Sequence, residues 1–454
     1  MKILLVRPPR IKQAITLSDF MFSEPLGLEM ICGALKGDHE VEIFDMMIEE
    51  KSLLEKIKDW KPDTVGITSL CIDVNMVLSL CGQVKQASPQ IVTVVGGTQA
   101  FLHPQAFFHE TVDHVFHYTR KKNLMAFYRG LQKGELVKID GILSRAHGYE
   151  STGTPGTNEY FLPDRGGTAR YRNEYSYFGY RPAAIMEFGT GCEKVCDFCL
   201  RWRIEGAKET LIDEGLTRMD LMAIKEPTIM LIDNDLFSGR EKIESLIRLV
   251  KELGIKKNLI GYGSVAGILH HREYIKELGE IGLKALLVGY ETFSDEEMTR
   301  YQKSSTPADN FMAAEILREA GIDVWASFMA HPDWDEGDFK LLRKTVKKLD
   351  PQITSISPLT PFPNLPLFEE YKERLLYPVE DYEKWSFGQV MIRPSRLSLG
   401  RYYFELLKTN IYVNLVVNNN TEMIKTFGGK NSLQILKGSL KAAKKYLLLM
   451  MKSD

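Results

Sequence analysis

Two long stretches of this 454-residue chain alternate between apolar, strand-like runs and helical segments. In the first stretch, helices are expected around residues 52–60 and 76–86, and strands at 1–9, 41–46, 64–70 and 91–100. Near-continuous Val and Ile runs are typical of parallel strands that are buried on both faces. Residues 1–145 are therefore expected to form a Rossmann-like, doubly wound sheet.

The second stretch repeats this alternation. Strands are expected at 183–188, 228–233, 258–267, 284–292, 323–332 and 353–362, and a helix at 240–254 has apolar residues three and four positions apart. In parallel α/β barrels the site lies at the carboxyl ends of the strands. The polar residues there are Asp233, Asn234, Asp235, Tyr290, Glu291 and His331, each of which could equally be a helix cap or a solvated loop residue.

Three cysteines share one short loop: Cys192, Cys196 and Cys199. They are too few for a four-cysteine zinc site, and the nearest downstream histidines, His270 and His271, are far away in the sequence. Three thiolates can hold a [4Fe-4S] cluster and leave its fourth iron open. The remaining cysteines are scattered, so we do not expect a disulfide framework. Three unrelated buried thiols are the alternative.

The pattern CxxxCxFC, preceded by a strand, resembles the radical S-adenosylmethionine superfamily, and Phe198 matches its aromatic position. The resemblance implies a partial (β/α)6 barrel over residues 181–375, with a cluster that binds S-adenosylmethionine and generates a 5′-deoxyadenosyl radical. The segment 289–292 (GYET) is similar to a GIES segment of that superfamily, which implies that Glu291 contacts S-adenosylmethionine. Asp233 and Asp235 are weaker candidates for the same role, because no GGE sequence accompanies them.

The N-terminal stretch lacks the G-x-G-x-x-G of a dinucleotide site, and its paired glycines come late, at Gly96 and Gly97. With segments 24–45 and 66–73 it resembles the cobalamin-binding domain that precedes the barrel in one subgroup. The resemblance implies that Ser69, Gly96 and Gly97 approach cobalamin and that Cys71 and Asp73 cover its lower face. Residues 45–50 read DMMIEE instead of D-x-H-x-x-G, so no axial histidine is expected. A nucleotide-binding or purely structural sheet is the alternative.

Composition separates the remaining regions. A net charge of −2 and 44% hydrophobic content argue against nucleic acid as a partner and provide core for two or three domains. No apolar run approaches the ~20 residues that span a bilayer, and the first residues lack a secretory apolar core, so we expect a cytoplasmic protein. Residues 146–180, and within them 148–167, are expected to be a linker. Residues 376–454 are expected to be helical, basic and amphipathic, either packed on the barrel or in peripheral contact with a membrane.

Segments 357–368 and 391–398 resemble hopanoid C-methylases, and the whole chain also resembles the anaerobic cyclase subgroup. The resemblance implies an enzyme that transfers methyl from methylcobalamin to an unactivated carbon of a small, hydrophobic or lipid-like substrate, with electrons from a low-potential donor such as flavodoxin or ferredoxin. No catalytic side chain is assigned. A cyclase or ring-rearranging enzyme, and a non-catalytic cobalamin or redox sensor, are the alternatives.

Overall fold

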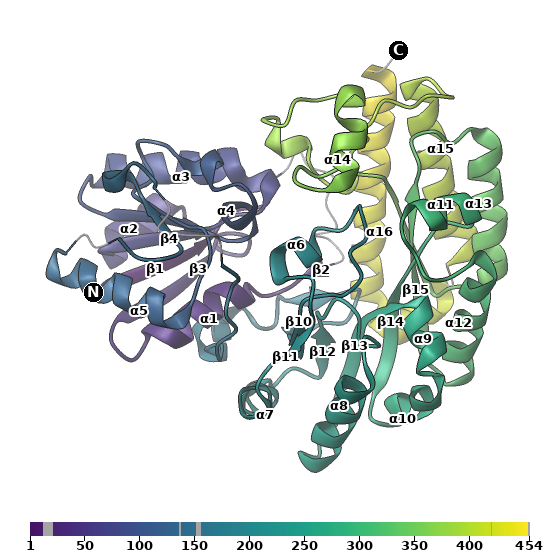
Figure 1. Cartoon of the computed structure of the whole chain (residues 1–454), viewed down its shortest axis with the longest axis horizontal. Helices are drawn as coiled ribbons and strands as arrows, with labels where there is room; N and C mark the ends of the chain where they lie inside the picture. The colour runs from purple at the N-terminus through teal and green to yellow at the C-terminus, as the bar shows by residue number, and fades with distance from the viewer. Residues whose placement is uncertain (12–20, 136–137, 151–155, 419, 453–454) are drawn as a thin grey trace.

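The computed structural model describes residues 1–11, 21–135, 138–150, 156–418 and 420–452. It contains two six-stranded sheets, an N-terminal one and a second one that curves into a partial barrel, and a pair of long C-terminal helices (Figure 1). This confirms the expected fold class: an α/β chain with a Rossmann-like sheet, a partial (β/α)6 barrel and a helical C-terminal region. The domain boundaries given above stay predictions, and residues 151–155 of the expected linker lie outside the described part of the chain.

The N-terminal sheet has the order β3-β1-β4-β5-β6-β7, in which β7 is antiparallel to β6 and the other pairs are parallel. Among the five parallel strands this is the order 2-1-3-4-5, which places a ligand at the carboxyl edge beside β1 and β4. The strands are β1 (Lys2–Arg7), β3 (Glu40–Asp45), β4 (Thr64–Thr68), β5 (Val92–Gly96), β6 (His114–Phe116) and β7 (Ile142–Ser144).

Helices cover both faces of this sheet because each has one apolar side. On one face, α2 (Leu53–Trp60) and α3 (Val74–Ala87) share a core with the sheet. On the other face, α1 (Leu26–Leu35) and α5 (Lys121–Lys133) do so. The expected strand at 91–100 is wrong in its second half: Gly97 has φ +94°, and α4 (Thr98–Leu102) begins immediately after it.

The second sheet has the order β16-β15-β14-β13-β12-β9, and all its neighbouring strands are parallel. The strands are β9 (Ala183–Met186), β12 (Thr228–Leu231), β13 (Asn258–Ser264), β14 (Leu283–Glu291), β15 (Asp323–Ala330) and β16 (Ile353–Pro358). The outer helices are α7 (Glu214–Ala223), α8 (Arg240–Glu252), α9 (Val265–His270), α10 (Ile275–Glu280), α11 (Asp295–Arg300), α12 (Pro307–Glu319) and α13 (Glu336–Leu349). All six strands expected in this stretch are present, but those expected at 258–267 and 353–362 end earlier, at Ser264 and Pro358.

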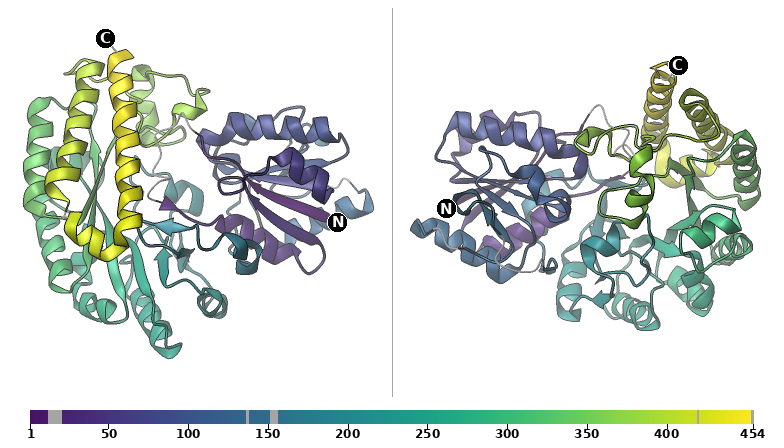
Figure 2. Two further views of the ribbon diagram at one scale, coloured as in Figure 1. Left: turned by 180° about the vertical axis from the view of Figure 1, so that it is seen from behind. Right: turned by 45° about the horizontal axis from the view of Figure 1, so that its top comes forward.

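Three further helices follow the barrel: α14 (Pro366–Tyr371), α15 (Leu399–Tyr412) and α16 (Asn420–Lys452). A π-helical turn, Val413–Val417, ends α15, and α16 bends at Gly428, whose φ is 76°. The two long helices lie side by side, and α15 also packs against α13 (Figure 2). Within the described residues, none of the helices is both long enough and apolar enough to cross a membrane.

A buried arginine joins the two sheets. Arg165 donates to Glu24 (2.9 Å) and Glu29 (3.2 Å) at α1, to both oxygens of Asp220 in α7 (2.8 and 2.7 Å), and to the carbonyl of Ile185 in β9 (3.0 Å). These five contacts match the five N–H groups of a guanidinium. Arg165 therefore fixes the N-terminal sheet against the first strand of the barrel.

Candidate functional site

The three-cysteine loop follows β9 and the short strand β10 (Gly189–Thr190) and precedes the short helix α6 (Arg201–Glu205). Its end is tied back by the Cys192 amide, which donates to the Gly206 carbonyl (3.1 Å), and its middle by the Trp202 indole, which donates to the Cys196 carbonyl (3.0 Å). Gly191 has φ +89°, and a β-carbon there would lie 2.1 Å from the Lys208 carbonyl oxygen. The turn that presents the cysteines therefore requires glycine at this position.

All three thiols line one cavity of about 1420 Å³. Burial raises the pKa of each thiol, to about 11 for Cys199, so each must lose a proton when iron binds. Among the described residues, no three Cys, His, Asp or Glu side chains converge on the position of a single ion. Cluster thiolates each bind a different iron and need no common point, so this donor set fits a cluster better than a zinc ion.

Next to the cysteines, Asp235 forms the centre of a buried polar group. Its carboxylate accepts from the Lys194 ammonium (2.6 Å), from the Ser264 hydroxyl (2.6 Å), and from backbone amides of Phe237 and Ser264 (both 3.1 Å). Burial opposes the charge, but Lys194 and these hydrogen bonds outweigh it and hold the pKa of Asp235 below its usual value. Lys194, Asp235 and Ser264 all line the cavity. Together they offer an ammonium, a carboxylate and a hydroxyl group, which can bind both charges of a zwitterionic ligand.

Glu291 lines the same cavity from the end of β14. Its φ is +62°, and the pairing of β14 with β15 shifts register between Gly289 and Glu291. Such irregularities re-aim a side chain at the end of a strand. Its carboxylate pairs with Lys303 (2.8 Å), whose ammonium lies 5.7 Å from the ring centre of Phe198, the aromatic residue of the cysteine motif.

Asp233 takes a different place from its neighbours. It accepts from the Phe188 amide (2.8 Å) and pairs with the buried Lys242 (2.8 Å), and it is not among the described residues that line the cavity. These contacts brace the loop after β9 against α8. Tyr290 and His331 are also buried away from the cavity. Of the six strand-end residues expected from the sequence, Asn234, Asp235 and Glu291 therefore line the cavity and the other three do not.

The opposite wall of the cavity is the carboxyl edge of the N-terminal sheet, where the loops after β1, β3, β4 and β5 meet. Cys71 and Asp73 line the cavity from the segment after β4, and His103 lines it from the segment after β5, at the end of α4. Burial raises the pKa of Asp73 to about 6 and that of Cys71 to about 12. Loops from different strands thus converge where a doubly wound sheet binds its ligand.

Ser69, Gly96 and Gly97 lie one layer behind this wall: their neighbours Thr68, Leu70 and Thr98 line the cavity. The Ser69 amide donates to the Gly96 carbonyl (2.9 Å), and a β-carbon at Gly97 would lie 2.7 Å from the Ser69 nitrogen. Glycine at position 97 therefore lets two loops of the sheet pack closely. Their expected approach to cobalamin stays a prediction.

The loop of Cys71 supports a direct test. Cys71 faces the cavity together with Val379 and Tyr382 from the segment before α15, so an indole at this position would occupy cavity space that a ligand needs. We expect Cys71→Trp to weaken cobalamin retention about tenfold or more, since the overpacking that arises when the ligand and the indole share this space typically costs about 1–3 kcal/mol. Reductive formation of 5′-deoxyadenosine, which depends on the cysteine loop, should stay close to the parent rate. Cys71→Ala is the control, and normal cobalamin retention by Cys71→Trp would show that this loop is not beside the corrin.

Sequence reasoning missed several residues of the cavity. Lys194 and Lys303, the cations beside Asp235 and Glu291, are single lysines without a motif, and Ser264 reads as an ordinary helix cap. His103 comes from the loop after β5, whereas the expectation of no axial histidine considered only the segment after the second strand. Ser264 is the last residue of β13, so its position at a strand end was a signal that could have found it. Lys194, Lys303 and His103 lie away from the strand ends and carried no such signal.

The third wall is C-terminal and mostly apolar. It includes Ile353 and Ile356 of β16, Phe362, and residues from α15 to α16, namely Asn410 and Ile411 of α15, Asn414 and Leu415 of the π-helical turn, Asn418 after that turn, and Leu440, Ala443 and Tyr446 of α16. Single-ligand pockets typically measure about 300–1,000 Å³. A cavity of about 1420 Å³ with three different walls has room for more than one ligand.

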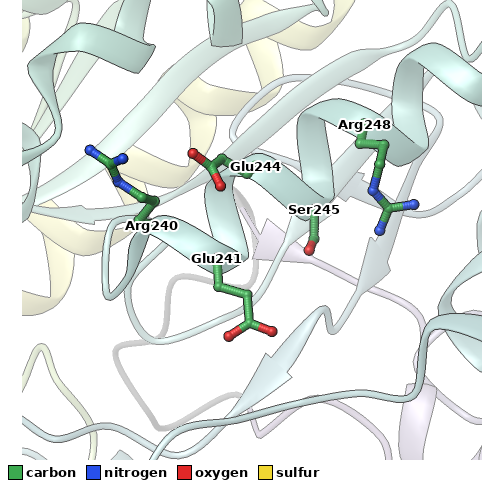
Figure 3. Close-up of a pocket in the computed structure, with 5 residues that line it drawn as sticks. All are labelled: Arg240, Glu241, Glu244, Ser245 and Arg248. Atoms are coloured by element: carbon green, nitrogen blue, oxygen red, sulfur yellow. The ribbon is translucent and has the colours of Figure 1, made fainter.

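Another hollow lies on the outer face of α8 (Figure 3). Its five lining residues, Arg240, Glu241, Glu244, Ser245 and Arg248, all come from this one helix. Arg240 pairs with Glu273 (3.6 Å) and Arg248 with Glu214 (2.6 Å), as in an ordinary solvated helix face. The cysteine loop and the strand-end residues belong to the large cavity, which is therefore the candidate site.

Two known families match the two parts of the chain that form the N-terminal wall and the barrel wall of the cavity. Residues 14–123 match the B12-binding domain, and residues 186–346 match the radical SAM superfamily. The hopanoid C-3 methylase of Methylococcus capsulatus is 27% identical over 399 residues, which cover 86% of this chain and 76% of that protein. The anaerobic magnesium-protoporphyrin IX monomethyl ester cyclase of Rubrivivax gelatinosus is 24% identical, with 83% of this chain and 71% of that protein covered.

Solved structures show the same fold. The radical S-adenosylmethionine methyltransferase TsrM from Kitasatospora setae, with cobalamin and a [4Fe-4S] cluster bound, superposes with a TM-score of 0.73 and 14% identity, covering 98% of this chain and 99% of that one. The cobalamin-dependent radical enzyme OxsB, with aqua-cobalamin and S-adenosylmethionine bound, gives 0.70 and 14%, covering 96% and 72%. The expected resemblance and the expected set of cofactors are confirmed.

Proposed function

Because the chain is a cobalamin-dependent radical S-adenosylmethionine enzyme, we propose that it methylates an unactivated carbon of a hydrophobic, lipid-like substrate. One observation carries the proposal: a single cavity is lined by the three-cysteine loop, by the ligand-binding edge of the N-terminal sheet and by an apolar C-terminal wall. Methyl transfer to a carbon radical needs the radical source, the methyl carrier and the substrate within one enclosed space.

We assign the residues of the barrel to two tasks. Cys192, Cys196 and Cys199 would hold the cluster, while Asp235, Glu291 and Phe198 would position S-adenosylmethionine beside it. The carboxylates are held by Lys194, Ser264 and Lys303, so they are already oriented before a ligand arrives. When bound, the cluster and S-adenosylmethionine supply a carbon-centred radical by reductive cleavage, and cobalamin supplies the methyl group.

We assign the N-terminal sheet to cobalamin. The loops after β1, β4 and β5 face the cavity with Arg7, Cys71, Asp73 and His103, and the segment that contains Val379 and Tyr382 covers the loop after β4. This cover would exclude water from the space between cobalamin and the cysteine loop, which protects a radical from side reactions.

The C-terminal wall supports the substrate class. Its surface is mainly aliphatic and aromatic, and a column of three asparagines, Asn410, Asn414 and Asn418, runs along it at helical spacing. The Asn418 side-chain oxygen is buried without a hydrogen-bond partner. An amphiphile with a polar head and an extended apolar body would satisfy both features. The similarity to the hopanoid C-3 methylase also supports a lipid-like substrate.

The test is turnover by the anaerobically reconstituted protein with a low-potential reductant and S-adenosylmethionine that carries a trideuterated methyl group. Lipid extracts from cells with and without the gene provide candidate substrates. We expect one labelled methyl group in the product, together with both S-adenosylhomocysteine and 5′-deoxyadenosine. A product that has lost hydrogen and carries no label would instead identify a cyclase, and the absence of 5′-deoxyadenosine would identify a sensor.

A further inference from the structure

Exposed apolar side chains concentrate at the C-terminal end of the chain. Of the nineteen large apolar residues that are exposed among the described ones, nine lie between Ile411 and Met451. They are Ile411, Leu415, Val416, Ile424, Leu433, Leu440, Leu447, Leu448 and Met451. A concentration of this kind marks a surface that interacts with something apolar.

On α16 these residues form one face with a regular pattern. Leu433, Lys437, Leu440, Lys444, Leu447 and Met451 follow one another at steps of four and three residues, and all are exposed. The buried positions Gly438 and Tyr446 lie on another side of the helix. In the view from behind, α16 lies at the surface with no other element in front of it (Figure 2, left).

This face is also positively charged. The sequence of α16 contains seven lysines and one glutamate, although the whole chain has a net charge of −2. Lysines within an apolar strip are unusual for a protein partner, because the cores of protein interfaces are depleted in lysine. At a lipid surface the same arrangement is favourable, since the lysine stem lies in the interface and its ammonium reaches the phosphates.

The cavity opens at this surface. Ile411, Leu415 and Leu440 are 45%, 67% and 61% exposed, and all three also line the cavity. Ala443 and Tyr446 line it further inside, and Tyr446 is almost completely buried. An apolar path therefore leads from the exposed end of α15 and the adjacent face of α16 into the candidate site.

We propose that the face formed by Ile411, Leu415, Leu433, Leu440, Leu447 and Met451 docks on an anionic phospholipid bilayer, with the mouth of the cavity turned toward the lipid. The inference that this face docks on a bilayer depends only on the exposure of the face and on its positive charge. The further step, that a lipid-like substrate enters the cavity from the bilayer through this mouth, rests on the proposed function. The helix lies in the interface and does not span the bilayer, consistent with its lysine content.

Flotation of the full-length protein with vesicles tests the docking without any cofactor or turnover. We expect the protein to float with vesicles of phosphatidylglycerol and phosphatidylcholine, to float much less with phosphatidylcholine alone, and to dissociate as salt is raised. The double variant Lys437→Glu/Lys444→Glu should lower the partition coefficient about tenfold or more, because basic residues near an anionic surface act additively. Leu447→Gln/Met451→Gln should weaken binding at both low and high salt.

The matched control is Lys122→Glu/Lys133→Glu. It changes the net charge by the same amount as Lys437→Glu/Lys444→Glu, but at exposed positions of α5, a helix that covers the N-terminal sheet. Equal loss of binding in this control would overturn the proposal, since only total charge would then matter. Absence of flotation with anionic vesicles at low salt would overturn it as well. So would a dimer in sedimentation that the α16 variants disrupt, because a second copy would then cover the face.

The two proposals can fail separately. Docking with no methyl transfer to any lipid extract refutes the function and leaves the docking intact. Methyl transfer to a substrate in detergent, at equal rates for the parent and the Lys437→Glu/Lys444→Glu variant, combined with no vesicle binding, refutes the docking alone.

Discussion

Replacement of Cys192, Cys196 and Cys199 by alanine is expected to abolish iron binding and reductive cleavage of S-adenosylmethionine, to the level of a sample without protein. The three thiols are on one loop, which α6 and the Gly191 turn hold at the cavity wall. No other cysteine of the described chain joins them there except Cys71, which lies on the wall formed by the N-terminal sheet. Iron content, the absorbance of the reconstituted protein and 5′-deoxyadenosine formation measure the result.

The control is Cys32→Ala/Cys81→Ala, which removes two buried thiols of α1 and α3, the helices on the two faces of the N-terminal sheet. This variant should keep its iron and its 5′-deoxyadenosine formation. The triple variant should still bind cobalamin, because its changes lie in the barrel loop, and cobalamin binding therefore reports that it is folded. Substantial 5′-deoxyadenosine from the folded triple variant would contradict the assignment of the cluster.

The features that the sequence predicted correctly are local. Each barrel strand is a short apolar run, and the cysteine loop is a spacing within eight residues, so a window of the sequence contains all the necessary information. The strand expected at 91–100 was too long because the break depends on one backbone angle, the positive φ of Gly97. Asp235 and Glu291, which were expected at the carboxyl ends of barrel strands, line the cavity, and their contact with S-adenosylmethionine stays a prediction.

The features that the sequence did not predict join residues that are distant in the chain. Lys194 meets Asp235 across 41 positions and Ser264 across 70. Asp233 and Asp235 are two positions apart after the same strand, yet one braces a loop and the other faces the cavity. Which of two such carboxylates faces inward depends on packing against α8, and no local pattern encodes that.

The buried group around Arg165 is the clearest case of this kind, because it involves the linker, α1 and α7. Arg165 and Arg172 share four buried carboxyl groups: Glu24, Glu29, Asp220 and Glu226. Burial raises the pKa of Glu24 to about 7 and also raises that of Glu29, although both arginines act in the opposite direction. The group therefore contains more acid than base, and Arg165 is its main source of compensating charge.

We expect Arg165→Ala to destabilise the protein by about 3–5 kcal/mol, since it leaves buried carboxylates without a partner. Arg165 is a positioning residue: it contacts no expected cofactor but fixes the cobalamin side of the cavity relative to the cysteine loop. The variant should therefore lose methylated product faster than 5′-deoxyadenosine, so that the ratio of the two falls. Arg165→Lys keeps the charge but not the fork of donors, and its ratio should lie between those of the parent and the alanine variant.

The stability difference should also depend on pH. A carboxyl group whose pKa is raised in the folded state stabilises the fold at low pH, and this contribution is lost as pH rises from about 4.5 through the folded pKa of about 7. Without Arg165 these carboxyl pKa values rise further, so the variant should be closest to the parent near pH 5 and furthest from it near pH 8. Arg343→Ala, which breaks the buried pair with Glu405 (2.9 Å) between α13 and α15, is the matched control. It should lose comparable stability but keep the parent's ratio of methylated product to 5′-deoxyadenosine, and an equal fall of this ratio in both variants would show that Arg165 acts through stability alone.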